Sequence, residues 1–147
     1  MRPVLALATT LALLVILVSA AFALSEPAYV KAANKICAQR AAKLDKLPRV
    51  SLQKMSSRAL ATRLRKVIGI YRPGTRQLRA LKAPHSFSLL VPRWLHYEDL
   101  RMAAWRSAVD AALRHKKGEA LSYVGKSNVL GRRAAEISTG LEIDRCE

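Results

Sequence analysis

The chain has 147 residues, and its 26 Lys and Arg against 10 Asp and Glu give a formal net charge of +16. This length indicates one domain rather than several, and two cysteines permit a single internal disulfide at most. The strongly basic balance directs attention to anionic partners.

The first stretch of the chain is predicted to be a targeting segment rather than part of the fold. Arg2 and the terminal amine form a short positive region, and residues 5–18 form an apolar core. Residues 21–23, with the sequence AFA, match the A-x-A pattern of a cleavage site, with small residues at its first and third positions. We therefore expect cleavage after Ala23 and an exported protein.

Cleavage makes residues 1–23 a signal peptide and leaves residues 24–147 as a single helical domain. The alternative is an uncleaved anchor, because residues 4–24 are long enough to span a hydrocarbon layer of about 30 Å. No cysteine lies at the end of the apolar core, which counts against a lipid-modified N-terminus. Three basic residues follow the apolar segment closely: Lys31, Lys35 and Arg40. Because positively charged segments tend to stay in the cytoplasm, they count against export.

Export would place Cys37 and Cys146 in an oxidising compartment, where they can form one disulfide between the first helix and the C-terminal tail. In the chain-entropy account, a bridge closing a loop of this length stabilises the fold by about 4 to 5 kcal/mol. The alternative is two unpaired buried thiols in a cytoplasmic protein.

From Ser25 onward the sequence shows no alternating strand pattern, and apolar residues recur at helical spacing, which predicts an all-α fold. The first helix has Ser25 as N-cap and Pro27 in its first turn, and it ends at Pro48. Its predicted buried stripe is Val30, Ala33, Cys37, Ala41 and Leu44.

The second helix is predicted to begin at a cap formed by Ser51. Pro73 clashes with the carbonyl of Gly69 in a regular helix, so the helix should be kinked or broken near Pro73. Its apolar residues keep one phase on both sides of the proline: Leu60, Leu64, Val67, Ile68, Tyr71, Leu78 and Leu81.

A third helix is expected from about residue 87 or 91 to residue 117, with Gly118 ending it, and a fourth from 119 to about 139. Gly140 is expected as a left-handed cap. The stripes are Val91, Trp94, Leu95, Met102, Trp105, Val109, Ala112 and Leu113 in the third helix, and Tyr123, Leu130, Ala134 and Ile137 in the fourth. Four amphipathic helices with short connections predict a monomeric antiparallel four-helix bundle with one disulfide.

Four short motifs carry a resemblance: YVKAANKICAQRAAKLDKLP after the signal segment, LRALKAP in mid-chain, a later Trp-containing helix ending near a Gly, and a closing GLEIDRC. The chain resembles a group of small exported helical proteins of unknown function from high-GC Gram-positive bacteria. These pair an Ile-Cys in the first helix with a Gly-Leu and a Cys at the end. The resemblance implies export and the disulfide and carries no activity, and this chain is far more basic than that group.

The second helix also carries a basic stripe. At about 100° per residue its members fall on one narrow face, opposite the apolar face, if the helix continues through Pro73. The members are Lys54, Arg58, Arg65, Arg72, Arg76 and Arg79. An exported protein meets membrane headgroups and cell-wall polyanions first, so we expect these before nucleic acid or an acidic protein. Few aromatics and no recognised motif count against nucleic acid. The alternative is a solvated face without a ligand.

Signs of catalysis are weak, and we expect neither an enzyme nor a cofactor. His85, His96 and His115 show no metal-ligand spacing. The unusual residue is Glu98, which falls in the apolar stripe of the third helix. Burial would favour the neutral form of its carboxyl group unless a nearby cation pairs with it. Arg40, near the edge of the first stripe, is the expected cation, so we interpret Glu98 as half of a structural ion pair.

A second function remains open, in which the bundle is a small-molecule binding module with an aromatic-lined groove between helices. The groove residues would be Trp94, Tyr97, Glu98, Trp105 and Tyr123. Salt separates the two functions, because attachment through the basic stripe weakens with ionic strength and binding of an apolar ligand does not.

Overall fold

The computed structural model describes residues 23–146, and within them the fold is all-α. The predicted signal segment lies, apart from Ala23, outside the described residues. The elements in chain order are α1 (Glu26–Asp45), η1 (Leu52–Lys54), α2 (Ser57–Ala80), η2 (His85–Phe87), α3 (Leu90–Leu113), α4 (Lys117–Gly140) and η3 (Asp144–Cys146), where η denotes a short 3-10 helix. None of these helices is both long and apolar enough to cross a membrane.

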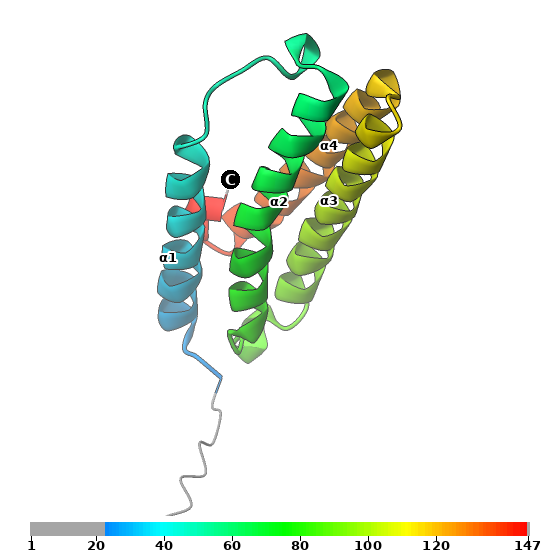
Figure 1. Ribbon diagram of the computed structural model, residues 1–147. Coiled ribbons are helices and arrows are strands. Elements are labelled where there is room, and N and C mark those ends of the chain that lie inside the picture. The colour runs from blue at the N-terminus through cyan, green and yellow to red at the C-terminus, as the bar shows by residue number, and fades with distance from the viewer. Residues whose placement is uncertain (1–22, 147) are drawn as a thin grey trace, which may run out of the picture.

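The four α-helices run alternately up and down, as Figure 1 shows, so each is antiparallel to the next along the chain. The helix α3 packs extensively against α4 and against α2, whereas α1 contacts mainly α2 and the C-terminal turn η3. The predicted antiparallel four-helix bundle is therefore confirmed. Within it, α1 is joined to a more closely packed unit of α2, α3 and α4.

The buried apolar side chains form two clusters. The upper cluster, in the orientation of Figure 1, joins α2, α3 and the start of α4 and includes Leu60, Leu64, Met102, Trp105 and Val109. The lower cluster joins α1, the end of α2, the start of α3 and the C-terminal turn, and includes Tyr29, Cys37, Leu78, Trp94 and Ile143. Arg40 contacts both clusters, through Tyr71 of the upper cluster and Cys146 of the lower one.

The start of α2 differs from the prediction. Ser51 precedes the short helix η1 and its side chain caps no backbone group, whereas the Ser56 hydroxyl accepts a hydrogen bond of 3.3 Å from the Ala59 amide. Ser56 is the N-cap because residues 52–54 form a separate turn first. The helix then continues through Pro73 without a break, with Tyr71, Thr75 and Leu78 buried on the same side.

In α1 and α4 the buried face overlaps the predicted stripe only in part: Ala33, Cys37 and Ala134 are buried as predicted, but other members are not. In α1 the buried residues are Tyr29, Ala33, Cys37 and Arg40, while Ala41 is exposed. In α4 the core face consists of small residues, Ala120, Val124, Ser127, Gly131, Ala134 and Ser138, while Tyr123 and Leu130 are only partly buried. Hydropathy alone favours the large side chains, but small ones let α4 approach α3 closely.

The helix ends also differ from the prediction, because neither expected glycine ends a helix by adopting positive φ. The helix α3 ends at Leu113, before Gly118, and α4 includes Gly140. His115 and Glu142 adopt the left-handed conformation instead, each with φ of 60°. The amides that follow complete Schellman motifs: Lys116 N–H donates to Ala111 C=O at 2.9 Å, and Ile143 N–H donates to Ser138 C=O at 2.8 Å.

Replacing His115 with Gly should stabilise the protein by about 1 kcal/mol, because a side chain with a Cβ is strained in the left-handed region. A matched control is Ser122→Gly on the exposed face of α4, which should destabilise by about 0.5 to 1 kcal/mol. Urea unfolding of both variants measures the difference. A loss of stability in His115→Gly equal to that of the control would contradict the assigned helix end.

Candidate functional site

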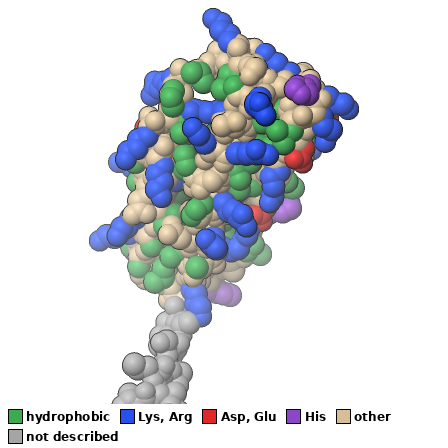
Figure 2. All heavy atoms as spheres, in the orientation of Figure 1, with side chains coloured by type: hydrophobic (Ala, Val, Ile, Leu, Met, Phe, Trp, Pro, Cys, Tyr) green, Lys and Arg blue, Asp and Glu red, His purple; other side chains and the backbone are tan. Residues whose placement is uncertain are grey.

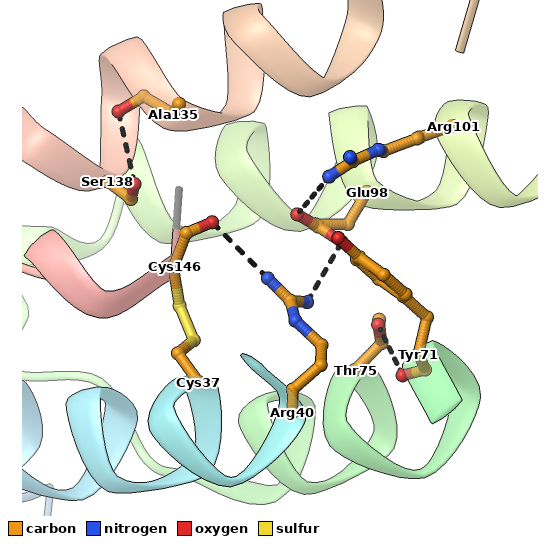
Figure 3. Close-up of polar contacts among 9 residues, drawn as sticks. All are labelled: Cys37, Arg40, Tyr71, Thr75, Glu98, Arg101, Ala135, Ser138 and Cys146. Carbon is orange, nitrogen blue, oxygen red and sulfur yellow. Dashed lines mark hydrogen bonds and ion pairs between the residues drawn. A yellow bond between two sulfur atoms is a disulfide. The ribbon is translucent and has the colours of Figure 1, made fainter. Parts of the chain in front are cut away.

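The most unusual feature of the core is a buried ion pair between α1 and α3. Arg40 is 4% exposed and Glu98 is completely buried, and Arg40 Nη1 donates to Glu98 Oε2 at 3.2 Å. The pair expected from the sequence is confirmed. Figure 3 shows the Arg40 side chain reaching from α1 toward the Glu98 carboxylate on α3. Burial of either charge alone would cost several kcal/mol, so the pair fixes both side chains.

Arg40 also ties α1 to the C-terminal tail. Its second terminal nitrogen, Nη2, donates to the Cys146 carbonyl at 3.3 Å. Cys146 forms the predicted disulfide with Cys37, with a Cα–Cα distance of 4.9 Å. Cys37 and Arg40 are three residues apart and share one face of α1, so the covalent and ionic contacts hold the same part of that helix (Figure 3).

A second arginine, Arg101, completes the buried layer. Arg101 is 16% exposed, and its Nη1 lies 3.9 Å from Glu98 Oε1 on the same helix. The Tyr71 ring contacts both guanidinium groups, with its centroid 4.2 Å from Cζ of Arg40 and 4.9 Å from Cζ of Arg101. Gly131 leaves the space for Arg101, because a Cβ at that position would lie only 2.8 Å from Arg101 Cζ.

The cluster has the geometry of a buried ion pair. The Glu98 carboxylate is enclosed on all sides, so a substrate cannot reach it. Its Oε1 atom has no hydrogen-bond partner among the described residues and receives only the longer ionic contact from Arg101. The layer therefore balances charge inside the core and positions α1 against α3.

The five residues predicted to line an aromatic groove do not share one. Trp94 and Glu98 are fully buried and Trp105 is 5% exposed, and the two tryptophans belong to different clusters. Tyr97 and Tyr123 are partly buried. Trp105 packs edge-to-face on Tyr71, with ring centroids 4.6 Å apart, and so fills the core as aromatic residues ordinarily do.

The three histidines do not form a site in the structure. His85, His96 and His115 are all exposed, and no three His, Cys, Asp or Glu side chains in residues 23–146 gather where a metal ion could bind. Burial in the lower cluster raises the pKa of Tyr29 to about 12, so this phenol ionises less readily than an exposed tyrosine.

The basic stripe lies on the surface as predicted, although not all of it belongs to α2. Lys54 lies in η1, and the other five members lie on α2; all six are exposed. Arg79 forms an ion pair with Asp99 of α3, and this hydrogen bond raises the pKa of Arg79. Among residues 23–146 the other five have no carboxylate partner within 4.0 Å: Lys54, Arg58, Arg65, Arg72 and Arg76.

Figure 2 shows the face formed by α1 and α2, where Lys and Arg side chains are spread widely and few acidic side chains appear. Two further cations that the sequence did not single out, Arg63 and Lys66, line an apolar groove beside the start of α2. The sequence pattern indicates these two residues only weakly, because both lie outside the narrow stripe. The groove itself depends on the path of the connection between α1 and α2.

Comparison with known proteins adds no relative. No protein-family model, curated protein or solved structure matches the chain. The resemblance to small exported helical proteins stays a prediction.

The buried pair should dominate stability, which variants of two neighbouring acids can test. Glu98→Gln leaves the Arg40 charge without its partner and should destabilise by about 3 to 5 kcal/mol. Asp99→Asn is the matched control, because it removes only the surface ion pair with Arg79. The Asp99 side chain is 50% exposed and that of Arg79 is 51% exposed, so this loss should cost less than about 1 kcal/mol.

Urea unfolding at neutral pH compares these variants, and the double variant Arg40→Met/Glu98→Leu should recover most of the loss, because it removes both buried charges together. Equal small losses in Glu98→Gln and Asp99→Asn would contradict the importance of the pair.

Proposed function

We propose that the protein is a non-enzymatic extracytoplasmic helical protein that associates with anionic surfaces, membrane or cell-wall polyanion, through the basic stripe. The observation that carries the proposal is the set of exposed cations on one face without carboxylate partners. Such a face concentrates anions near the protein. The stripe is rigid because α2 is anchored by its opposite side, where Leu60, Leu64 and Tyr71 are buried.

Two features support the extracytoplasmic location. The disulfide between Cys37 and Cys146 is of the kind that persists in oxidising compartments. The predicted signal segment, which lies outside the described residues, would deliver the chain there. In that location an anionic membrane surface or wall polymer is the first partner that a basic face meets.

The energetics are compatible with reversible attachment. Each basic residue close to an anionic bilayer contributes about 1 kcal/mol before salt screening. The stripe members without acidic partners together supply an affinity that weakens as salt screens the interaction over a Debye length of about 8 to 10 Å at physiological ionic strength. The protein would therefore bind strongly at low salt and release at high salt.

Replacing Arg65, Arg72 and Arg76 with Gln should weaken binding to anionic vesicles about 10- to 100-fold, since three attractive charges are lost. Co-sedimentation with phosphatidylglycerol-rich vesicles and with purified wall fragments, at low and high salt, measures the loss. The fold should remain, because all three side chains are exposed and form no ion pair within residues 23–146.

A matched control removes the same charge from the other helices, with Arg93, Arg106 and Arg132 of α3 and α4 replaced by Gln. This control should retain most of the binding. Unchanged binding of the α2 variant, or an equal loss in the control, would reject the stripe as the attachment surface.

A further inference from the structure

A groove of about 480 Å³ lies between the connection from α1 to α2 and the first turns of α2. Four of its lining residues are apolar: Pro48, Val50, Met55 and Ala59. Val50 is 49% exposed although it is a large aliphatic residue. The volume falls in the range of about 300 to 1,000 Å³ that is common for small-molecule sites.

The groove follows from the path of the chain after α1. The helix ends at Asp45, Pro48 prevents its continuation, and the chain crosses to η1 before Ser56 caps α2. Met55 packs against the upper cluster and so anchors the connection, but Val50 belongs to neither cluster. An apolar wall is therefore left open to solvent at the top of the molecule in Figure 1.

Three cations surround this apolar wall. Arg58, Arg63 and Lys66 line the groove, and no Asp or Glu does. None of the three has a carboxylate within 4.0 Å in the part of the chain that the structure describes. The positive end of the α2 dipole lies at the same place and adds to the potential. Long basic side chains can lay their methylene stems along an apolar surface while the charge faces outward.

We propose that this groove binds one single-chain anionic amphiphile, a fatty acid or a lysophospholipid. The acyl chain lies along the apolar wall, and the carboxylate or phosphate head is held by Arg58, Arg63 and Lys66. The acyl chain and the anionic head each match one part of the groove. The apolar wall favours burial of the chain, and the cations attract the negative head.

Other occupants fit less well. A peptide backbone has no net charge for the three cations to hold, and the Ser56 and Thr62 hydroxyls each already make one hydrogen bond within α2, with the Ala59 amide and the Arg58 carbonyl. A second copy of the chain would bring its own formal charge of +16 toward the same cations. That repulsion disfavours self-association through this groove.

The inference goes beyond surface attachment, because it concerns one molecule bound from solution. The groove shares Arg58 with the basic stripe, but its other residues, among them Ala59, Arg63 and Lys66, lie outside the stripe. The stripe variant Arg65→Gln/Arg72→Gln/Arg76→Gln should therefore keep the groove ligand, so either proposal can fail without the other.

Isothermal titration of the intact protein tests the groove, with laurate and with lauroyl lysophosphatidylglycerol below their micelle concentrations. Lauroyl lysophosphatidylcholine has the same chain with a head of no net charge. We expect one site per chain for the two anionic amphiphiles and at least tenfold weaker binding of the phosphocholine. Which of the two anionic heads binds more tightly distinguishes a free fatty acid from a lipid source.

Ala59→Trp fills the groove and should weaken binding at least tenfold, whereas Ala80→Trp, exposed at the far end of α2, should bind like the unaltered protein. Val50→Asp is a second groove variant, in the connection, whose exposed position preserves folding. Arg63→Gln/Lys66→Gln should weaken binding of the anionic amphiphiles and leave the phosphocholine unaffected.

Three results would overturn the proposal. The first is full affinity for laurate in both Ala59→Trp and Val50→Asp. The second is equal affinity for the anionic and phosphocholine amphiphiles. The third is evidence for a different occupant. This would be tighter binding of an acidic leucine-containing peptide than of either amphiphile, or a dimer seen in analytical sedimentation that Ala59→Trp abolishes.

Discussion

A charged guanidinium in the middle of a helical bundle is the constraint on which the rest of this structure depends. Arg40 is 4% exposed and must find acceptors inside the protein, because an unpaired buried charge would cost a large part of a domain's stability of about 5 to 15 kcal/mol. Its acceptors are the Glu98 carboxylate on α3 and the Cys146 carbonyl in the C-terminal turn. These two contacts fix the height of α1 along the bundle.

The layer formed by Arg40 and Glu98 also affects the surface, because Glu98 is buried and cannot neutralise a surface cation. The chain has only 10 Asp and Glu, and Glu98 lies in the core, where it pairs with Arg40 and lies 3.9 Å from Arg101. The stretch that contains α2 has no acid of its own, so its outward cations have few partners beyond Asp99. The architecture thus leaves a basic face and a basic-rimmed groove open to anions, which is the basis of both proposals.

Periodicity predicted the features that depend on which face of a helix a residue occupies. Cys37 falls on the buried stripe of the first helix and Glu98 on that of the third, and this placed the disulfide and the ion pair correctly. The core face of α4 was predicted only in part, at Ala134, because Ser127 and Gly131 are small and their close packing depends on the neighbouring helix. The groove was missed because it depends on the path of the connection, which no helical period encodes.

The claim that the Arg40 contacts hold α1 in place is tested most directly by amide hydrogen exchange of the Glu98→Gln variant with its disulfide intact. Peptide-level mass spectrometry resolves each helix, and local opening has its own free energy in each part of a fold. The account predicts that α1 and residues 141–146 lose protection first, while α2, α3 and α4 keep most of theirs. An equal loss in all four helices, or unchanged protection in α1, would contradict it.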